Sequence, residues 1–315
     1  MERRKVICVV GPTACGKTTL GVLLAKKYGG EVVSADSMQI YRGMTIGTAA
    51  PTEAEMQDVP HHMIAVADPA EQWSAAEYVR RATPVVDDIL ARGRLPVIVG
   101  GTGLWMDALL RGHGFAKGSA GGAVRRELET RFEQEGIEPL LAELRQVDPD
   151  SAVRLHPADT KRILRALEVY RETGQTITAH NVATRAMPDR YSAVKIGLRF
   201  ADREDMKALI DRRVDKMAAE GLLTEVRALL DRGLPKNATA MQAIGYKEFL
   251  GVLDGTLTEP EALELVKLRS RQYAKRQLTW LRRDQDIHWI EWGKQRDFAR
   301  ALQISTEILA ASGLG

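Results

Sequence analysis

The chain has 315 residues, 44% of them hydrophobic, and this length exceeds one average domain, so we expect one large domain with an insertion. No window approaches 18 consecutive apolar residues, and the first residues, MERRKV, contain no apolar leader, so we expect a cytoplasmic protein without membrane spans. The only two cysteines, Cys8 and Cys15, exclude a disulfide framework. A formal net charge of +3 is too small by itself to indicate a polyanionic partner.

The first predicted strand, Lys5 to Val10, runs into a phosphate-binding loop, GPTACGKT, which matches Gly-x-x-x-x-Gly-Lys-Ser/Thr. A helical run to Tyr28 follows. The loop consists of Gly11, Pro12, Thr13, Ala14, Cys15, Gly16, Lys17 and Thr18. Backbone N–H groups at the helix start would face a phosphate, Lys17 would neutralise it, and the Thr18 hydroxyl would ligate Mg²⁺. The alternative is a plain glycine-rich turn, which the flanking strand and helix disfavour.

Two further predicted strands end in polar groups. The run Glu31 to Ala35 delivers Asp36, and the run LPVIV leads into Gly100 to Gly103, a glycine-rich turn that opens a helix. Because ligand groups of open α/β sheets gather at the carboxyl ends of the strands, Asp36 and Thr102 are expected beside the phosphate loop. From local sequence alone, Asp36 has a second possible role as the N-cap of a turn, Ser37 to Tyr41.

A histidine pair and a long helix lie between these strands. His61 and His62 could bind a metal, but no Cys or third His stands nearby, which favours hydrogen-bonding roles. Helical periodicity extends from Ser74 to Arg92, with a kink or restart expected at Pro84.

From Gly112 the composition changes. Residues 112–123, GHGFAKGSAGGA, are typical of a linker, and Val124 to Gly174 carries helical patterns without a strand candidate, which predicts an inserted helical subdomain. Within it Lys161, Arg162 and Arg165 lie along one helix, either as a binding surface or as an ordinary solvated face.

The chain then returns to the sheet. Ser192 to Phe200 is a predicted strand, a helix starting at Asp202 continues through Arg213, and Ile287 to Glu291 is strand-like. Between these lies KLRSRQYAKRQLTWLRR, with Tyr273 and Trp280 among seven basic residues and no acidic one. The seven are Lys267, Arg269, Arg271, Lys275, Arg276, Arg282 and Arg283. Cations with flat side chains suit single-stranded or looped RNA, and the alternative is a helix with an aromatic core face and a solvated basic face.

Eight blocks spread over almost the whole chain carry a resemblance. They are GPTACGKT at 11–18, SADSMQIYRGM at 34–44, IGTA at 46–49, PHH at 60–62, GGTGL at 100–104, HPADTKRILRALEV at 156–169, AMQAIGYKEF at 240–249 and YAKRQLTWLRR at 273–283. In this order they resemble the tRNA dimethylallyltransferase family, also called tRNA isopentenyltransferase. The chain departs from the usual family residues at Cys15, Thr18, Ala50 and Trp105, none of which removes a candidate catalytic group.

The resemblance implies a reaction and roles for its residues. A dimethylallyl group would pass from dimethylallyl diphosphate to N6 of the adenine just 3′ of the anticodon, position 37, in tRNA. Asp36 would be the general base, while the loop, Lys17 and Mg²⁺ on Thr18 would stabilise the leaving diphosphate. Thr102 would hydrogen-bond the phosphates, and Arg213 resembles a family arginine that reaches them. The implied tRNA contacts are Asp36, Ser37, Met38, Gln39, Thr102, Thr160, Lys161, Arg162, Ile163, Leu164, Gln242, Ala243, Ile244, Gly245, Tyr246, Lys247, Lys275, Arg276, Gln277, Leu278, Thr279, Trp280, Leu281 and Arg282.

We therefore predict an α/β fold with a P-loop NTPase-like parallel sheet flanked by helices, an inserted all-helical subdomain and a helical C-terminal region. Residues 1–114 would begin the catalytic core, 115–190 would form the tRNA-contacting insertion, and 191–315 would complete the core and add tRNA-binding helices. A monomer is expected. Two rival classes stay open, a small-molecule or nucleotide kinase and a nucleotide-binding switch that holds RNA, because a phosphate loop does not distinguish ATP from a prenyl diphosphate.

Overall fold

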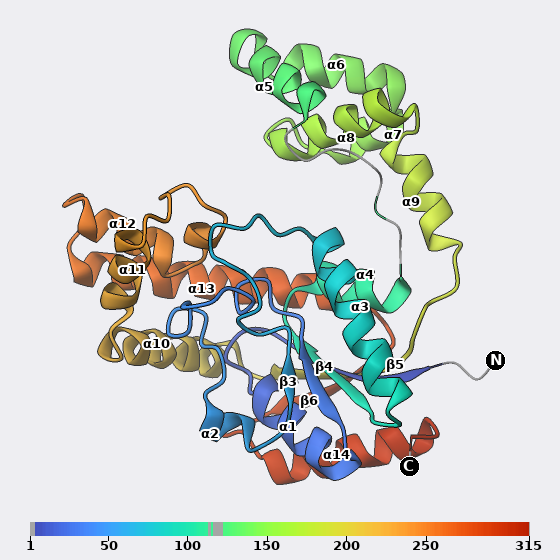
Figure 1. Cartoon of the computed structure of the whole chain (residues 1–315), viewed down its shortest axis with the longest axis vertical. Coiled ribbons are helices and arrows are strands. Elements are labelled where there is room, and N and C mark those ends of the chain that lie inside the picture. The colour runs from blue at the N-terminus through green and yellow to red at the C-terminus, as the bar shows by residue number, and fades with distance from the viewer. Residues whose placement is uncertain (1–3, 113–114, 116–121, 315) are drawn as a thin grey trace. The chain divides into compact units, whose positions relative to one another are not determined.

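The computed structural model describes residues 4–112, 115 and 122–314. The chain divides into two compact units, Met1–Gly112 together with Arg190–Gly315, and His113–Asp189 (Figure 1). Most of the glycine-rich linker predicted at 112–123 lies outside the described residues.

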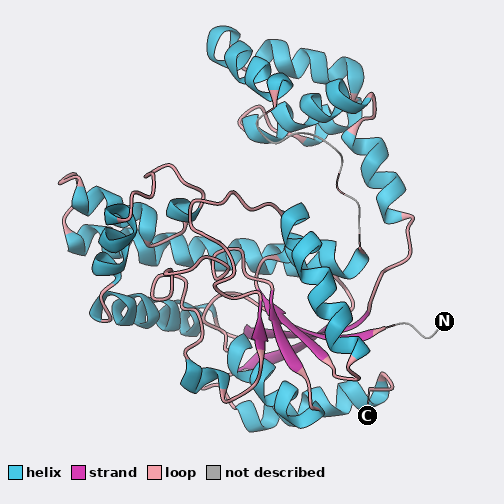
Figure 2. Ribbon diagram, viewed as in Figure 1, coloured by secondary structure: helices cyan, strands magenta, loops and turns pink. Residues whose placement is uncertain are grey.

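The first unit is built on a six-stranded sheet in the order β3-β2-β4-β1-β5-β6, and every neighbouring pair is parallel. The strands are β1 (Lys5–Val10), β2 (Glu31–Ser34), β3 (His61–His62), β4 (Pro96–Gly100), β5 (Ser192–Phe200) and β6 (Ile287–Trp292). Figure 2 shows these strands side by side with helices around them, which confirms the predicted fold class. Strand β3 was not predicted, because two residues are too few to show an alternating pattern.

Helices cover the sheet and extend its C-terminal part. They are α1 (Lys17–Tyr28), α2 (Glu53–Met56), α3 (Ala75–Ala91), α4 (Gly103–Arg111), α10 (Arg203–Ala219), α11 (Leu222–Asp231), α12 (Tyr246–Leu253), α13 (Glu259–Leu281) and α14 (Phe298–Ala311), with a 3-10 turn at Ala240–Gln242. Helix α3 continues through Pro84, so the alternative of a restart there was wrong. The apolar side chains of β1 that face α1 and α14, Ile7 and Val9, are fully buried in one core cluster.

The second unit is helical throughout its described part. Its helices are α5 (Ala123–Glu135), α6 (Glu138–Val147), α7 (Pro149–Arg154), α8 (Thr160–Thr173) and α9 (Ile177–Arg185). Leucines of α5 and α6 pack with Ile163 and Leu167 of α8 in a core of its own. Across the described parts of both units, no helix combines the length and the apolarity needed to cross a bilayer.

Candidate active site at the carboxyl edge of the sheet

The loop between β1 and α1 leaves the start of a helix free for an anion. Gly11 adopts φ 150°, and a Cβ there would lie 2.5 Å from the carbonyl oxygen of Leu198 in β5, so only glycine fits this turn. Gly16 caps α1 in the left-handed conformation without a side-chain hydrogen bond, and the first turn holds no acidic residue. The N–H groups of that turn, together with the helix dipole, therefore favour a phosphate group.

The loop also supplies a cation and a hydroxyl. The Nζ of Lys17 donates a hydrogen bond to the carbonyl oxygen of Pro12 at 2.7 Å, which holds the ammonium group over the loop. Thr18 lies in the first turn of α1 and is partly exposed. No cluster of three or more His, Cys, Asp or Glu side chains occurs in the described residues, so a chelating protein cage is absent there. A single hydroxyl next to a phosphate site suits Mg²⁺, which keeps most of its waters and bridges phosphate oxygens.

The ends of β2 and β4 meet beside this loop. A Cβ on Gly100 would lie 2.3 Å from the carbonyl oxygen of Ala35, so glycine is required for the strands to approach this closely. The Oγ1 of Thr102 accepts a hydrogen bond from the backbone N–H of Ser37 at 3.1 Å and lies 3.4 Å from the Ser37 hydroxyl. The two segments that the sequence placed at strand ends are thus in direct contact.

Asp36 combines the two roles that its sequence position left open. Its Oδ1 accepts a hydrogen bond from the backbone N–H of Met38 at 3.0 Å, which caps the turn that follows β2. Its Oδ2 makes no hydrogen bond with any described residue, and the side chain is partly exposed. One oxygen therefore fixes the carboxylate, and the other remains available to a ligand.

Helix α10 brings Arg213 to the same edge. Its Nη2 donates to the carbonyl oxygen of Thr48 at 3.4 Å. Burial lowers the pKa of this guanidinium, and the charge of Asp36 is the largest opposing influence, with Cys15 of the loop next. Since arginine stays protonated, a cation lies within the electrostatic reach of both the loop and Asp36.

Tyr273 of α13 faces this site, which was not predicted. Burial raises its pKa to about 12, and the charge of Asp36 adds to the rise, whereas polar contacts with Thr102 and Gln277 and the charge of Arg276 oppose it. In the sequence Tyr273 stands out only as an aromatic residue in a basic run. Its spacing of four from Gln277, which puts both side chains on one helix face, was the signal that could have placed it here.

The loop after Asp36 is held by the side chains of Gln39 and Glu225. The Nε2 of Gln39 donates to the carbonyl oxygens of Thr48 and Ala49 at 3.3 and 3.1 Å, so this amide is engaged within the protein. The Glu225 carboxylate of α11 accepts hydrogen bonds from the N–H groups of Thr45, Ile46 and Gly47 at 2.8 to 3.0 Å. Glu225 was not predicted, because its partners lie far away in the chain.

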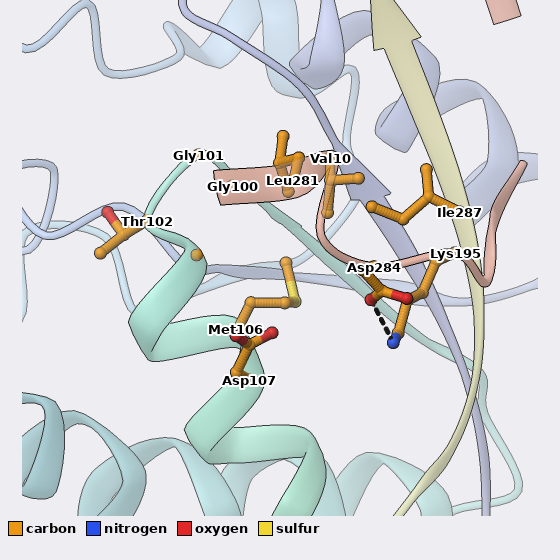
Figure 3. A pocket seen from close by; sticks show the side chains of 11 residues that line it. Val10, Gly100, Gly101, Thr102, Met106, Asp107, Lys195, Leu281, Asp284 and Ile287 are labelled. Atoms are coloured by element: carbon orange, nitrogen blue, oxygen red, sulfur yellow. Dashed lines mark hydrogen bonds and ion pairs between the residues drawn. The ribbon is translucent and has the colours of Figure 1, made fainter. Parts of the chain in front are cut away.

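A narrow pocket lies behind the β1 and β4 ends, with room for about a single water molecule (Figure 3). Lys195 of β5 and Asp284 form an ion pair of 2.5 Å on one side of it, and the side chain of Thr102 points away from that pair. Asp107 of α4 also lines the pocket and accepts a hydrogen bond from the indole N–H of Trp280 at 3.1 Å. Burial raises the Asp107 pKa. The lining residues are Val10, Gly100, Gly101, Thr102, Gly103, Met106, Asp107, Lys195, Leu281, Asp284 and Ile287.

His61, His62 and Trp105, the last of which departs from the usual family residue, have roles within the fold. The Nδ1–H of His61 donates to the carbonyl oxygen of Val59 at 2.8 Å, and the Nε2 of His62 lies 2.7 Å from Glu31, which confirms the predicted hydrogen-bonding roles. The Trp105 ring stacks on Tyr78 at 4.4 Å and is buried. Trp105 therefore belongs to the core between α3 and α4.

The residues expected to contact RNA in the insertion divide into two groups. Lys161 and Arg162 are exposed on α8, and Thr160 is partly exposed. Ile163 and Leu164 are buried in the core of the helical unit, so they offer no surface to RNA. The block was assigned as a continuous run, but a helix has 3.6 residues per turn, so part of any such run faces the core.

The block at 242–247 needs the same correction. Gln242 and Lys247 are exposed, and Ile244 is partly exposed. Ala243, Gly245 and Tyr246 are buried, and the Tyr246 hydroxyl donates to Glu225 at 2.5 Å. Tyr246 therefore helps to anchor the loop after Asp36 instead of facing solvent.

Along α13 the exposed members of the predicted RNA-contacting set are Lys275, Arg276, Thr279, Trp280 and, just beyond the helix, Arg282. Leu278 is partly buried, whereas Gln277 and Leu281 are only 6% exposed. Both side chains point into the protein in this structure, so they offer little surface to RNA.

The sequence of the chain is similar to those of known proteins. A family model described as IPP transferase matches residues 39–284. The chain belongs to the IPP transferase family. It is 46% identical over 295 residues to a tRNA dimethylallyltransferase of Geobacillus thermodenitrificans, covering 94% of this chain and 93% of the relative. A relative of the same name from Symbiobacterium thermophilum is 48% identical, with 91% and 89% covered.

Solved structures of the family agree with the fold. The crystal structure of a tRNA isopentenylpyrophosphate transferase from Bacillus halodurans has a TM-score of 0.73 at 41% identity, covering 98% of this chain and 96% of that one. A eukaryotic dimethylallyltransferase acting on tRNA gives a TM-score of 0.82 at 29% identity, with 98% and 80% covered. Membership of the family confirms the resemblance read from the sequence, makes the chain a transferase, and rules out the kinase and switch alternatives.

Proposed function

We propose that this chain attaches the dimethylallyl group of dimethylallyl diphosphate to N6 of the adenine just 3′ of the anticodon, at the edge where β1, β2 and β4 end. Prenyl transfer to tRNA is the activity of the family to which the chain belongs. The observation that carries the proposed site is convergence: a helix start without a side-chain cap, a carboxylate with one free oxygen and a partly buried arginine share one edge of the sheet.

Asp36 is the general base in this proposal. The lone pair of the adenine amine is delocalised into the ring, so the amine is a weak nucleophile until its proton leaves. The free Oδ2 of Asp36 takes that proton while N6 forms its bond to C1 of the allyl group. The hydrogen bond from Met38 holds the carboxylate still during this step, and Thr102 fixes the neighbouring Ser37 backbone.

The phosphate loop stabilises the leaving group. As the C1–O bond breaks, diphosphate departs with both electrons, and negative charge grows on its oxygens. The N–H groups of the first turn of α1, the ammonium of Lys17 and the guanidinium of Arg213 are fixed donors for that charge. Mg²⁺ held by the Thr18 hydroxyl would supply further positive charge there.

The exposed part of the predicted RNA-contacting set holds the tRNA in this proposal. Exposed basic and amide side chains on α8, on and just before α12, and on and just beyond α13 are available for phosphates, and Trp280 is available for stacking. The acceptor adenine lies in a loop, so moving it out of its stack to reach Asp36 costs less than opening a duplex.

The decisive experiment incubates the protein with Mg²⁺, radiolabelled dimethylallyl diphosphate and unmodified tRNA carrying adenine 3′ of the anticodon. We expect labelled RNA and released diphosphate. A tRNA with guanine at that position should stay unlabelled, because guanine presents its exocyclic amine elsewhere on the ring. Labelling that does not depend on the base, or phosphoryl transfer from ATP in place of prenyl transfer, would overturn the proposal.

A further inference from the structure

One buried amide of α13 joins the two sides of the proposed active site. The side chain of Gln277 is 6% exposed. Its Oε1 accepts a hydrogen bond from the backbone N–H of Thr13, in the phosphate loop, at 2.9 Å. Its Nε2 donates to the carbonyl oxygen of Gly101, directly before Thr102, at 3.0 Å. A single side chain therefore connects the loop after β1 to the turn after β4.

The chemistry of this connection requires an amide. Thr13 presents a donor and Gly101 presents an acceptor, so the bridging group must accept on one atom and donate on its neighbour. A carboxylate lacks the donor, and an apolar side chain lacks both. The approach is also close: a Cβ on Gly101 would lie 2.2 Å from the Gln277 Nε2, so a side chain at this position would displace the amide.

The same face of α13 continues into the site. Tyr273, one turn before Gln277, lies close enough to Thr102 and Asp36 for both to influence its pKa. The exposed Lys275 lies on the opposite face, whereas the exposed Arg276 lies beside Tyr273, with its guanidinium 5.6 Å from the centre of the ring. One helix thus presents one face to the reacting groups and the other face to solvent.

We propose that Gln277 is a positioning residue for prenyl transfer. It fixes the distance between the diphosphate-binding loop and the Asp36–Thr102 edge, and hence between the leaving group and the base. This inference rests on the proposed function, because it presumes that the donor lies in the loop and the acceptor at that edge. Gln277 itself touches neither substrate.

The first test replaces Gln277 with methionine, which has similar length and no amide. Reacting groups that are misplaced by about an ångström lose on the order of 100-fold in rate, so we expect the single-turnover rate of Gln277→Met to fall about 10- to 100-fold. Binding of tRNA should stay within two-fold of the parent protein, since Gln277 is not on the RNA-facing surface. Gln272→Met, at an exposed glutamine on the same helix, is the matched control and should keep the parent rate.

A single-turnover rate of Gln277→Met within about three-fold of the parent would overturn the proposal. This failure is distinct from failure of the proposed function, in which the parent protein itself would not prenylate tRNA. Thermal unfolding of each variant shows whether a loss of rate merely follows a loss of fold.

The second test, Gln277→Glu, keeps the shape of the side chain and makes its hydrogen bonding depend on protonation. In Gln277→Glu the ionised carboxylate still accepts from Thr13 but repels the Gly101 carbonyl oxygen, and the protonated form restores both hydrogen bonds. Burial raises the pKa of such a carboxyl group. The ratio of the Gln277→Glu rate to the parent rate should therefore rise as the pH falls from 8 to 6. A ratio that stays flat would contradict positioning by hydrogen bonds, including when Gln277→Met fails to fold.

Discussion

Strand β2 carries a carboxylate near each end, and the two differ in almost every respect. Glu31, at the amino end, is 2% exposed, accepts two hydrogen bonds from Arg92 and contacts His62. Asp36, just past the carboxyl end, is partly exposed and uses one oxygen to cap a turn. The ionisable group with satisfied partners holds the fold together, and the group with a free oxygen is available for chemistry.

The largest expected effect comes from replacing Asp36, the carboxylate with the free oxygen. In Asp36→Asn the amide oxygen still accepts from the Met38 N–H, so the turn and the stability should be kept. The base is lost, and a general base contributes about 10²- to 10⁴-fold, so single-turnover prenylation should fall by that factor. Single-turnover kinetics with saturating tRNA and donor measure the loss.

Asp68→Asn is the matched control, because Asp68 also accepts a hydrogen bond from the N–H two residues on, Ala70, at 2.9 Å, and is exposed. It should turn over like the parent. Near-normal turnover of Asp36→Asn would remove Asp36 from the mechanism.

The next largest effect concerns the contribution of Glu31 to the stability of the fold. The hydrogen bonds from Arg92 are the main cause that lowers the Glu31 pKa from 4.5 to about 2, and the contact with His62 adds to them. Because the folded pKa lies below the unfolded one, the stabilisation is complete above about pH 4.5 and is lost as the pH falls towards 2. Glu31→Gln should therefore cost about 3 kcal/mol of unfolding free energy at pH 7, and less as the pH falls through that window.

Denaturant unfolding at pH 7 and at pH 3 measures this change. The prenylation rate of the folded Glu31→Gln protein should match that of the parent, since Glu31 lies at the opposite end of the strand from the reaction. A cost in stability that does not vary between the two pH values would show that the charge of Glu31 is not what stabilises this end.

Sequence patterns predict which residues lie at the carboxyl edge of the sheet, but they do not predict the side-chain contacts across that edge. Strands β1 and β5 were predicted with the bounds that the structure shows, because β1 is a nearly continuous apolar run and β5, SAVKIGLRF, alternates apolar residues with Lys195, Gly197 and Arg199. Asp36 and Thr102 could be placed near the loop, because parallel strands end together. The two hydrogen bonds of Gln277 could not be predicted, because its partners, Thr13 and Gly101, lie 264 and 176 residues away in the chain. Such pairings follow from packing, which local sequence does not encode.

The basic run of α13 repeats the contrast between the two carboxylates within one helix. In its first half Lys267, Arg269 and Arg271 pair with Asp215, Glu248 and Asp211 at 2.7 to 2.8 Å. In its second half Lys275 is exposed, and no described acidic side chain pairs with it. A run of seven basic residues with no acidic residue inside it thus overstates the surface available to RNA.

The smallest effect sharpens this division with one substitution made at two positions. Lys275→Gln should reduce the slope of log tRNA affinity against log salt by about 0.7 to 0.9, the value of one phosphate contact, and leave unfolding unchanged. Lys267→Gln should leave the slope unchanged and cost about 1 kcal/mol of stability, because the Lys267 side chain is only 16% exposed and bridges Asp215 and Glu264. Binding across a salt series and denaturant unfolding of both variants measure the two quantities. Equal changes of slope in both would mean that the acidic partners do not withdraw the first half of α13 from RNA, and that bound RNA competes for Lys267 as readily as for Lys275.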